Sequence, residues 1–302
     1  RRLLKKDIRV NMKNFHLAGI IPVHKNDFSF GFEWPDSLMP VASRLTAIER
    51  SVMECAWAGC ETIWIICNDD ISPVIRHRVG EMVQDPVWLR NMDTHPSMSR
   101  KPIPIFYVPI HPKHRDKIDC FGWSVIYGAL SIFKIAVKMS KWLVPGRYYV
   151  SFPYSVYDPK VVRPYRKEIS SPKGFCLSSD GKTIRDGAKL GFTFDKNDFI
   201  NYRRVIRKQG TGLYKTPEVG AYPRERHPPG MRHTARFFPL EKVFADTDVE
   251  NSRVVELPWS YSLDNWDEYV KYMSSEHQKE ITRPNKLFLS YREWNEIGVD
   301  DE

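Results

Sequence analysis

The first apolar run of the sequence, residues 15–23 (FHLAGIIPV), constrains the fold most strongly. It lacks the regular polar alternation of a strand that has one face in water. A run of this kind is typical of a strand that is covered on both faces, as in a parallel sheet between two layers of helices. The sequence therefore predicts an α/β fold built around residues 15–23.

Strands and helices alternate downstream of this run. Three further strands are expected, at residues 61–67, 103–110 and 147–152. Helices are expected between them, at residues 45–58, 74–79 and 121–142. Strand–helix–strand order at these spacings implies right-handed crossovers, and hence a mainly parallel sheet with helices on both faces.

The pattern loosens from about residue 153, where proline, glycine and aromatic residues become more frequent. A hairpin is expected around Asp180-Gly181, then a helix from Asp198 to Arg207 and a late helix over residues 263–274. The C-terminal half is thus expected to be richer in hairpins and loops. We expect three parts: a basic upstream or added segment, a nucleotide-binding-like α/β domain, and a substrate or accessory part on the same sheet, at residues 1–11, 12–165 and 166–302.

The chain is basic, with 46 Lys and Arg residues against 37 Asp and Glu residues and a net charge of +9. Part of this charge lies in residues 1–11, and another part in the Pro- and Gly-rich stretch 203–236. A basic loop of this composition suits phosphates or nucleic acid, and it equally suits a solvated surface. A nucleic-acid partner therefore stays open.

The cysteine content and the apolar stretches of the sequence indicate the cellular compartment. The five cysteines contain no CxxC pair, which argues against a zinc site and favours buried thiols in a reducing compartment. No apolar stretch reaches the ~20 residues of a membrane span, and no signal-peptide pattern is visible. We expect a cytoplasmic protein without a membrane partner.

Five blocks of this sequence, taken in order, resemble the sugar-nucleotide pyrophosphorylases, nucleotidyltransferases of the GT-A-like Rossmann class. The blocks are LAGI (17–20), PDSLMPV (35–41), IERSVMECAWAGCETIWIICNDD (48–70), DCFGWSVIYGAL (119–130) and SLDNWDEYVKYM (262–273). The sequence is also similar to the nucleotidyltransferase-type proteins of marine tailed phages that infect cyanobacteria. The resemblance implies a GT-A-like fold, nucleotide or nucleotide-sugar binding, and transfer between a nucleoside triphosphate and a sugar phosphate.

The resemblance also implies a site at the carboxyl ends of the strands, where open parallel sheets bind ligands. Nucleotide contacts are expected from Leu17, Ala18, Gly19, Asp69 and Trp123. Lys25, in the place of the phosphate loop, and Asp264, in the place of the family's late aspartate, are the expected catalytic residues. Mg²⁺ is expected on Asp264 together with one of Asp69, Asp70 and Asp158, because Mg²⁺ usually takes one or two carboxylates.

Three departures from the family pattern leave the activity open. Ile20-Ile21-Pro22 replaces the second glycine and the motif after it, Asp36 replaces a phosphate-neutralising lysine, and the aspartate that ends the fourth strand is missing. One alternative is a catalytically degenerate GT-A-like structural or assembly protein of a phage particle, present in the virion or in the host cytoplasm. In that case Asp264 is expected only to cap the helix after it, and Asp69 and Asp70 to cap theirs.

Overall fold

Strand β1 (Leu17–Pro22) lies at the centre of the sheet, and all six of its residues are buried. It pairs in parallel with β4 (Thr62–Cys67) on one side and with β7 (Arg147–Val150) on the other. Both neighbours are among the strands expected from the sequence. The computed structural model describes residues 16–23, 35–87, 102–110, 120–139, 144–209, 238–283 and 288–289.

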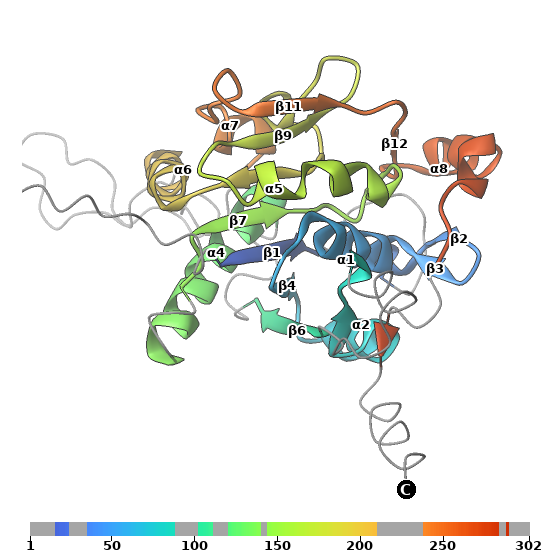
Figure 1. The fold of residues 1–302 in the computed structure, drawn as a ribbon, viewed down its shortest axis with the longest axis horizontal. Coiled ribbons are helices and arrows are strands. Elements are labelled where there is room, and N and C mark those ends of the chain that lie inside the picture. The colour runs from blue at the N-terminus through green and yellow to red at the C-terminus, as the bar shows by residue number, and fades with distance from the viewer. Residues whose placement is uncertain are drawn as a thin grey trace, which may run out of the picture.

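A single sheet of nine strands forms the core, in the order β11-β9-β10-β7-β1-β4-β6-β5-β13 (Figure 1). Its other strands are β5 (Met82–Gln84), β6 (Pro102–Pro109), β9 (Phe175–Ser178), β10 (Phe192–Phe194), β11 (Arg253–Glu256) and β13 (Phe288–Leu289). Strands β5 and β10 run against the others. The prediction of a mainly parallel α/β sheet is confirmed.

Helices cover both faces of this sheet. Gly19 of β1 faces Cys55 on helix α1 (Ala47–Ala58), whereas the next residue, Ile20, faces Gly128 on helix α4 (Phe121–Met139). Since neighbouring residues of a strand point to opposite faces, α1 and α4 lie on opposite sides. A Cβ atom at Gly128 would lie 2.8 Å from Ile66 Cγ1, so the glycine lets α4 approach the sheet closely.

Further elements extend these two layers. On the side of α1 lie the 3₁₀ helix η5 (Pro159–Tyr165) and α5 (Arg166–Ile169), and on the side of α4 lie α6 (Lys196–Gln209) and α7 (Leu240–Val243). The remaining elements are η2 (Asp36–Leu38), β2 (Pro40–Ala42), β3 (Leu45–Thr46), α2 (Ser72–Val79), β8 (Ser155–Val156), η6 (Ile184–Asp186), β12 (Tyr261–Ser262), α8 (Trp266–Met273) and η9 (Glu276–Lys279).

Among the described helices, α4 alone has the length and apolar composition of a membrane-spanning helix. Half of that apolar stretch is buried inside the structure. Gly122, Val125 and Ala129 lie on its buried side. Its apolar character is therefore explained, over that half, by packing on the sheet.

The C-terminal predictions are confirmed in outline. Ser179 and Lys182 form a bridge around Asp180 and Gly181, which both have positive φ, as expected of a tight hairpin turn. The division of the chain at residue 165 stays a prediction; β9, β10 and β11 lie beyond that residue in the same sheet. The segment 1–11 and the stretch from 210 to 237 lie outside the described residues.

Two predicted helix caps are wrong. Helix α8 begins at Trp266, and its N-cap is Asn265, whose side chain accepts the Glu268 amide, so Asp264 lies one residue outside. Helix α2 begins at Ser72 with Ile71 as its N-cap and no side-chain cap. Asp70 instead accepts the Ile71 amide at 3.0 Å, a turn that precedes the helix.

Helix α1 is enclosed on every side, and all twelve of its residues are buried. The Glu54 carboxylate lies in this interior and accepts hydrogen bonds from Arg50 (2.9 Å) and from the hydroxyls of Tyr149 (2.5 Å), Ser151 (2.7 Å) and Tyr157 (2.8 Å). Burial, and then the Glu54 charge, raise the pKa of both tyrosines, so both keep the protons that they donate. This network joins α1 to the segment that follows β7.

We expect Glu54→Gln to lower the free energy of unfolding by about 3–5 kcal/mol, because it leaves the fully buried Arg50 without its counter-ion. Urea unfolding followed by circular dichroism measures the difference. Glu250→Gln, at an exposed position, is the matched control and should change stability by less than about 0.5 kcal/mol. Equal effects of the two substitutions would show that the network contributes nothing.

The five cysteines are free and buried, as the sequence predicts. Burial raises the pKa of the Cys176 thiol to about 12, which leaves almost no reactive thiolate at neutral pH. We expect a thiol-specific reagent to label none of the five rapidly in the native protein and all five in concentrated guanidinium chloride. Rapid native labelling of Cys176, located by peptide mass spectrometry, would contradict this burial.

Candidate functional site

The carboxyl ends of β1, β4, β6 and β7 meet at one edge of the sheet. Helix α4 begins near this edge, since it follows β6 in the chain, and the short strand β8 follows β7 there. Figure 1 shows β12, α8 and the β2–β3 pair gathered at this end of the sheet, on the right. Ligands of open α/β sheets bind at such an edge, so the candidate site is built here.

An ion pair between Lys189 and Asp264 is the central polar feature of this edge. Lys189 lies three residues before β10, which runs against its neighbours and therefore starts at the carboxyl edge. Asp264 follows β12, and the Leu263 amide donates to the Tyr154 carbonyl at 2.8 Å, which fixes the segment. Ser262 Oγ donates to Asp264 Oδ2 at 2.5 Å, while the Lys189 ammonium contacts Oδ1.

The two charges differ in their exposure to water. The Lys189 side chain is 19% exposed and that of Asp264 is 43% exposed. Lys189 Nζ also lies 5.4 Å from the centre of the Phe121 ring, in a cation–π contact. The ammonium is thus the more enclosed partner, held between a carboxylate and an aromatic face.

Aromatic residues form the wall behind this ion pair. The ring of Phe121, at the start of α4, lies 5.8 Å from Phe152 and 5.3 Å from Tyr154, centre to centre. All three side chains are buried. Ser151 and Phe152 follow β7 directly, in the segment where the resemblance would place a metal-binding aspartate, so this segment carries no carboxylate at these two positions.

Trp123 and Tyr127 form a stacked pair on α4, with ring centres 4.6 Å apart and planes 15° apart. The Tyr127 hydroxyl donates to the Pro109 carbonyl at 3.2 Å, which ties the pair to the end of β6. Both rings are half-buried. Trp123 therefore presents part of a flat aromatic surface near the carboxyl edge, of the kind on which a base or sugar stacks.

The three candidate acids other than Asp264 lie in separate local settings. Asp69 and Asp70 are exposed just beyond the end of β4, at the same edge. Asp158 caps η5, where its Oδ1 accepts the Lys160 amide at 3.0 Å. Asp36, which stands where the family has a lysine, is half-buried in η2, and burial raises its pKa.

Leu17, Ala18 and Gly19 lie inside β1 rather than in a loop. Their backbones pair with β4 and β7, and a Cβ atom at Gly19 would lie 3.0 Å from Cys55 Sγ and 3.2 Å from Cys60 Sγ. Gly19 therefore admits α1 and its cysteines close to the sheet. Asp69, Trp123 and Asp264 belong to segments that reach this edge, and their convergence on one cleft stays a prediction; Lys25 lies outside the described residues.

The described residues at this edge do not form a ready Mg²⁺ site. Among the described residues, no group of three or more His, Cys, Asp or Glu side chains is placed to hold a metal ion. The expected ligand, Asp264, already has an ammonium on one oxygen and a hydroxyl on the other. Mg²⁺ takes oxygen ligands in an octahedral arrangement, and a lysine ammonium in contact with the same carboxylate opposes its binding.

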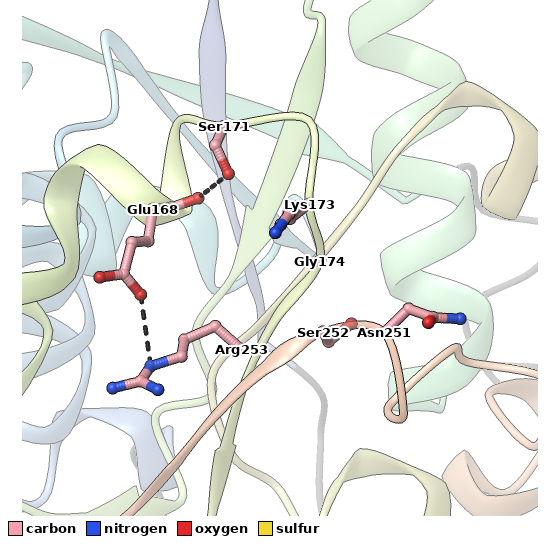
Figure 2. A pocket seen from close by; sticks show the side chains of 7 residues that line it. All are labelled: Glu168, Ser171, Lys173, Gly174, Asn251, Ser252 and Arg253. Atoms are coloured by element: carbon pink, nitrogen blue, oxygen red, sulfur yellow. Dashed lines mark hydrogen bonds and ion pairs between the residues drawn. The ribbon is translucent and has the colours of Figure 1, made fainter.

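A polar hollow lies at the opposite edge of the sheet, where β9 and β11 begin (Figure 2). Its volume is about 290 Å³, and it is lined by Glu168, Ser171, Lys173, Gly174, Asn251, Ser252 and Arg253. Glu168 and Arg253 form an ion pair at 3.3 Å, and Ser171 donates to the Glu168 carbonyl at 2.6 Å. Because it lies at the amino ends of these strands, this hollow is separate from the candidate site.

Lys189 and its aromatic wall are the residues that sequence reasoning missed. Lys189 stands in GAKLG, which matches no phosphate-binding motif. Only the direction of β10 places it at the carboxyl edge, and that direction follows from the hairpin with β9. The predicted hairpin was the sequence signal that could have located Lys189, but the pairing of β10 with β7 was not predicted.

The sequence matches no protein-family model and no curated protein. In structure, the chain is similar to a protein from Bacillus anthracis assigned as a glucose-1-phosphate thymidylyltransferase and solved with sucrose. The TM-score is 0.54 and the identity 9%, over 90% of this chain and 98% of that one. This similarity confirms the GT-A-like fold.

Two further structures superpose less well. A UDP-glucose pyrophosphorylase solved with UDP-glucose has a TM-score of 0.49 and 9% identity, over 88% of this chain and 99% of that one. The UDP-glucose pyrophosphorylase from Acinetobacter baumannii has a TM-score of 0.47 and 10% identity, over 88% of this chain and 96% of that one. Neither assigns a role to a residue of this chain.

We expect Gly19→Ala to destabilise the protein by about 1–3 kcal/mol, because the added methyl group overlaps Cys55 and Cys60. The free energy of unfolding in urea measures this cost. In a Cys60→Ala background the same substitution should cost clearly less, since one of the two sulfur contacts is removed. An unchanged cost in both backgrounds would contradict the packing role of Gly19.

Proposed function

We propose that this protein binds a nucleotide sugar, or a nucleoside triphosphate with a sugar phosphate, at the carboxyl edge of its sheet, as a nucleotidyltransferase-like protein. The observation that carries the proposal is the Lys189–Asp264 pair beside the aromatic residues of α4, at the edge where this fold class binds ligands. The names of the similar structures support the same ligand class.

The groups at the edge match the parts of such a ligand. The Lys189 ammonium suits phosphate oxygens, the Trp123 ring suits a base, and the exposed Asp69 carboxylate suits ribose hydroxyls. Asp264 orients Lys189, and its carboxylate is an acceptor for sugar hydroxyls. The site thus offers one positive, one aromatic and two acidic elements to a ligand that carries phosphate, base and hydroxyl groups.

In the reaction that we propose, an oxygen of the sugar phosphate attacks the α-phosphorus of a nucleoside triphosphate. A new P–O bond forms, the bond from the α-phosphorus to the bridging oxygen breaks, and pyrophosphate leaves. Charge develops on the transferred group and on the leaving oxygen, so the reaction needs cations near both. Lys189 is the described side chain best placed at this edge to supply one. A related glycosyl or nucleotidyl transfer would use the same groups.

Binding without turnover is the second candidate. Phe152 and Ser151 occupy the end of β7, and Asp36 puts a negative charge where the family carries a positive one. Both differences favour a catalytically degenerate protein that keeps the binding edge. A structural role in a phage particle, and nucleic-acid binding through residues 203–236, stay predictions from the sequence. The second rests on a stretch that lies mostly outside the described residues.

A thermal-shift screen against UDP-glucose, dTDP-glucose and nucleoside triphosphates tests the binding proposal. A ligand present at 100 times its Kd should stabilise the protein by about 2.7 kcal/mol. Stabilisation by nucleotide sugars but not by glucose or nucleosides is the expected result. No stabilisation by any member of the panel would contradict the proposal and favour the structural role.

We expect Trp123→Ala to weaken nucleotide binding by about tenfold to a hundredfold, because base stacking on an aromatic ring contributes about 1–3 kcal/mol. Isothermal titration calorimetry with the best ligand of the screen measures the loss. Trp123→Phe keeps a flat ring and should retain most of the affinity. If alanine binds as tightly as tryptophan, the base does not stack on Trp123.

A further inference from the structure

We propose that the Lys189 ammonium replaces a divalent cation at this site, so that the protein binds the diphosphate of its ligand without a metal ion. The inference rests on the proposed nucleotide-sugar binding and adds to it how the phosphates are recognised. It starts from the misfit between the expected Mg²⁺ site and the residues at the carboxyl edge. There a lysine ammonium contacts the carboxylate on which the metal was expected.

The first step concerns the position of the ammonium. Lys189 Nζ contacts Asp264 Oδ1, and Ser262 Oγ holds Oδ2 at 2.5 Å, so the carboxylate is oriented toward the lysine. A divalent ion at such a site bridges a protein carboxylate and a substrate phosphate. A lysine ammonium carries three N–H donors, and it can hold a carboxylate oxygen and a phosphate oxygen together.

The second step concerns the surroundings of the charge. Lys189 is only 19% exposed, and the Phe121 ring lies 5.4 Å from its Nζ, with Phe152 and Tyr154 packed behind that ring. An apolar wall excludes water from one side of the ammonium, which strengthens its attraction for an anion. A single enclosed lysine then competes well with a hydrated metal ion for the phosphate.

The third step concerns the acids that a metal would need. Asp158 is engaged as the cap of η5, Asp70 accepts the Ile71 amide, and the end of β7 carries Ser151 and Phe152 in place of an aspartate. Asp69 is left as the candidate second acid at this edge, and among the described residues no group of three or more His, Cys, Asp or Glu side chains is placed to hold a metal ion. One carboxylate already paired with one lysine favours an ammonium-based site.

Calorimetric titration of the full chain with UDP-glucose and with dTDP-glucose, in excess EDTA and in Mg²⁺, tests the inference. The variants are Lys189→Gln, Lys189→Arg and Asp264→Asn, with Lys173→Gln in the hollow at the opposite edge as the matched control. Thermal unfolding and circular dichroism of each variant show that it is folded. The binding constants are compared only among folded variants.

We expect the wild-type protein to bind equally well, within about twofold, in EDTA and in Mg²⁺. Lys189→Gln should weaken binding by about tenfold to a hundredfold in both buffers, because it removes a charged hydrogen-bond donor. Lys189→Arg should retain most of the affinity, and Lys173→Gln should change nothing. Asp264→Asn should change the affinity by the same factor in EDTA and in Mg²⁺, because no metal ion depends on its carboxylate.

Three results would overturn the inference. These are wild-type binding that is at least tenfold tighter in Mg²⁺ than in EDTA, Lys189→Gln binding as tightly as wild type, and a loss of affinity in Asp264→Asn that appears only in Mg²⁺. In each of them the wild-type protein still binds a nucleotide sugar, so the proposed function stands. If the wild-type protein binds neither ligand in either buffer, the proposed function fails and this inference fails with it.

Discussion

The Glu54 carboxylate is a negative charge that is fully buried. It is paired with Arg50 and accepts hydrogen bonds from three hydroxyl groups, which come from the end of β7 and the segment after it. Arg50 also donates to the Phe152 carbonyl at 2.8 Å. The network therefore sets how α1 lies on the sheet and where the chain goes as it leaves β7. The Phe152 and Tyr154 wall of the candidate site depends on that path, as does the segment that carries Asp264.

Local sequence patterns were enough to predict the parallel centre of the sheet. The apolar run of β1, the strands β4, β6 and β7 and the Gly59 end of α1 each follow from composition and periodicity within a few residues. The enclosure of α1 could not be predicted in this way. The partners of Arg50 and Glu54 come from about residues 149–157, which only the folded chain brings near.

The candidate site also contains residues that the sequence predicted and a residue whose position depends on long-range pairing. The order of the strands predicted the segments of Asp69 and Trp123 at the carboxyl edge, and the resemblance to the pyrophosphorylases predicted Asp264 there. Lys189 was missed because its position depends on the direction of β10, a pairing between distant segments. Asp264 was predicted as a metal ligand or a helix cap, and the structure shows it paired with Lys189. A sequence pattern identifies a residue type, but its partner comes from the fold.

The central claim is that the ligand lies at the carboxyl edge of the sheet, with its phosphates on Lys189. A crystal structure of the protein with a bound nucleotide sugar tests this claim most directly. The sheet has a polar group of residues at each of two edges, and the ligand density shows at which edge the ligand binds. The account predicts a phosphate oxygen within hydrogen-bond distance of Lys189 Nζ and a base near Trp123. Density at the opposite edge, beside Lys173 and Arg253, or a metal ion on Asp264 with Lys189 displaced, would contradict it.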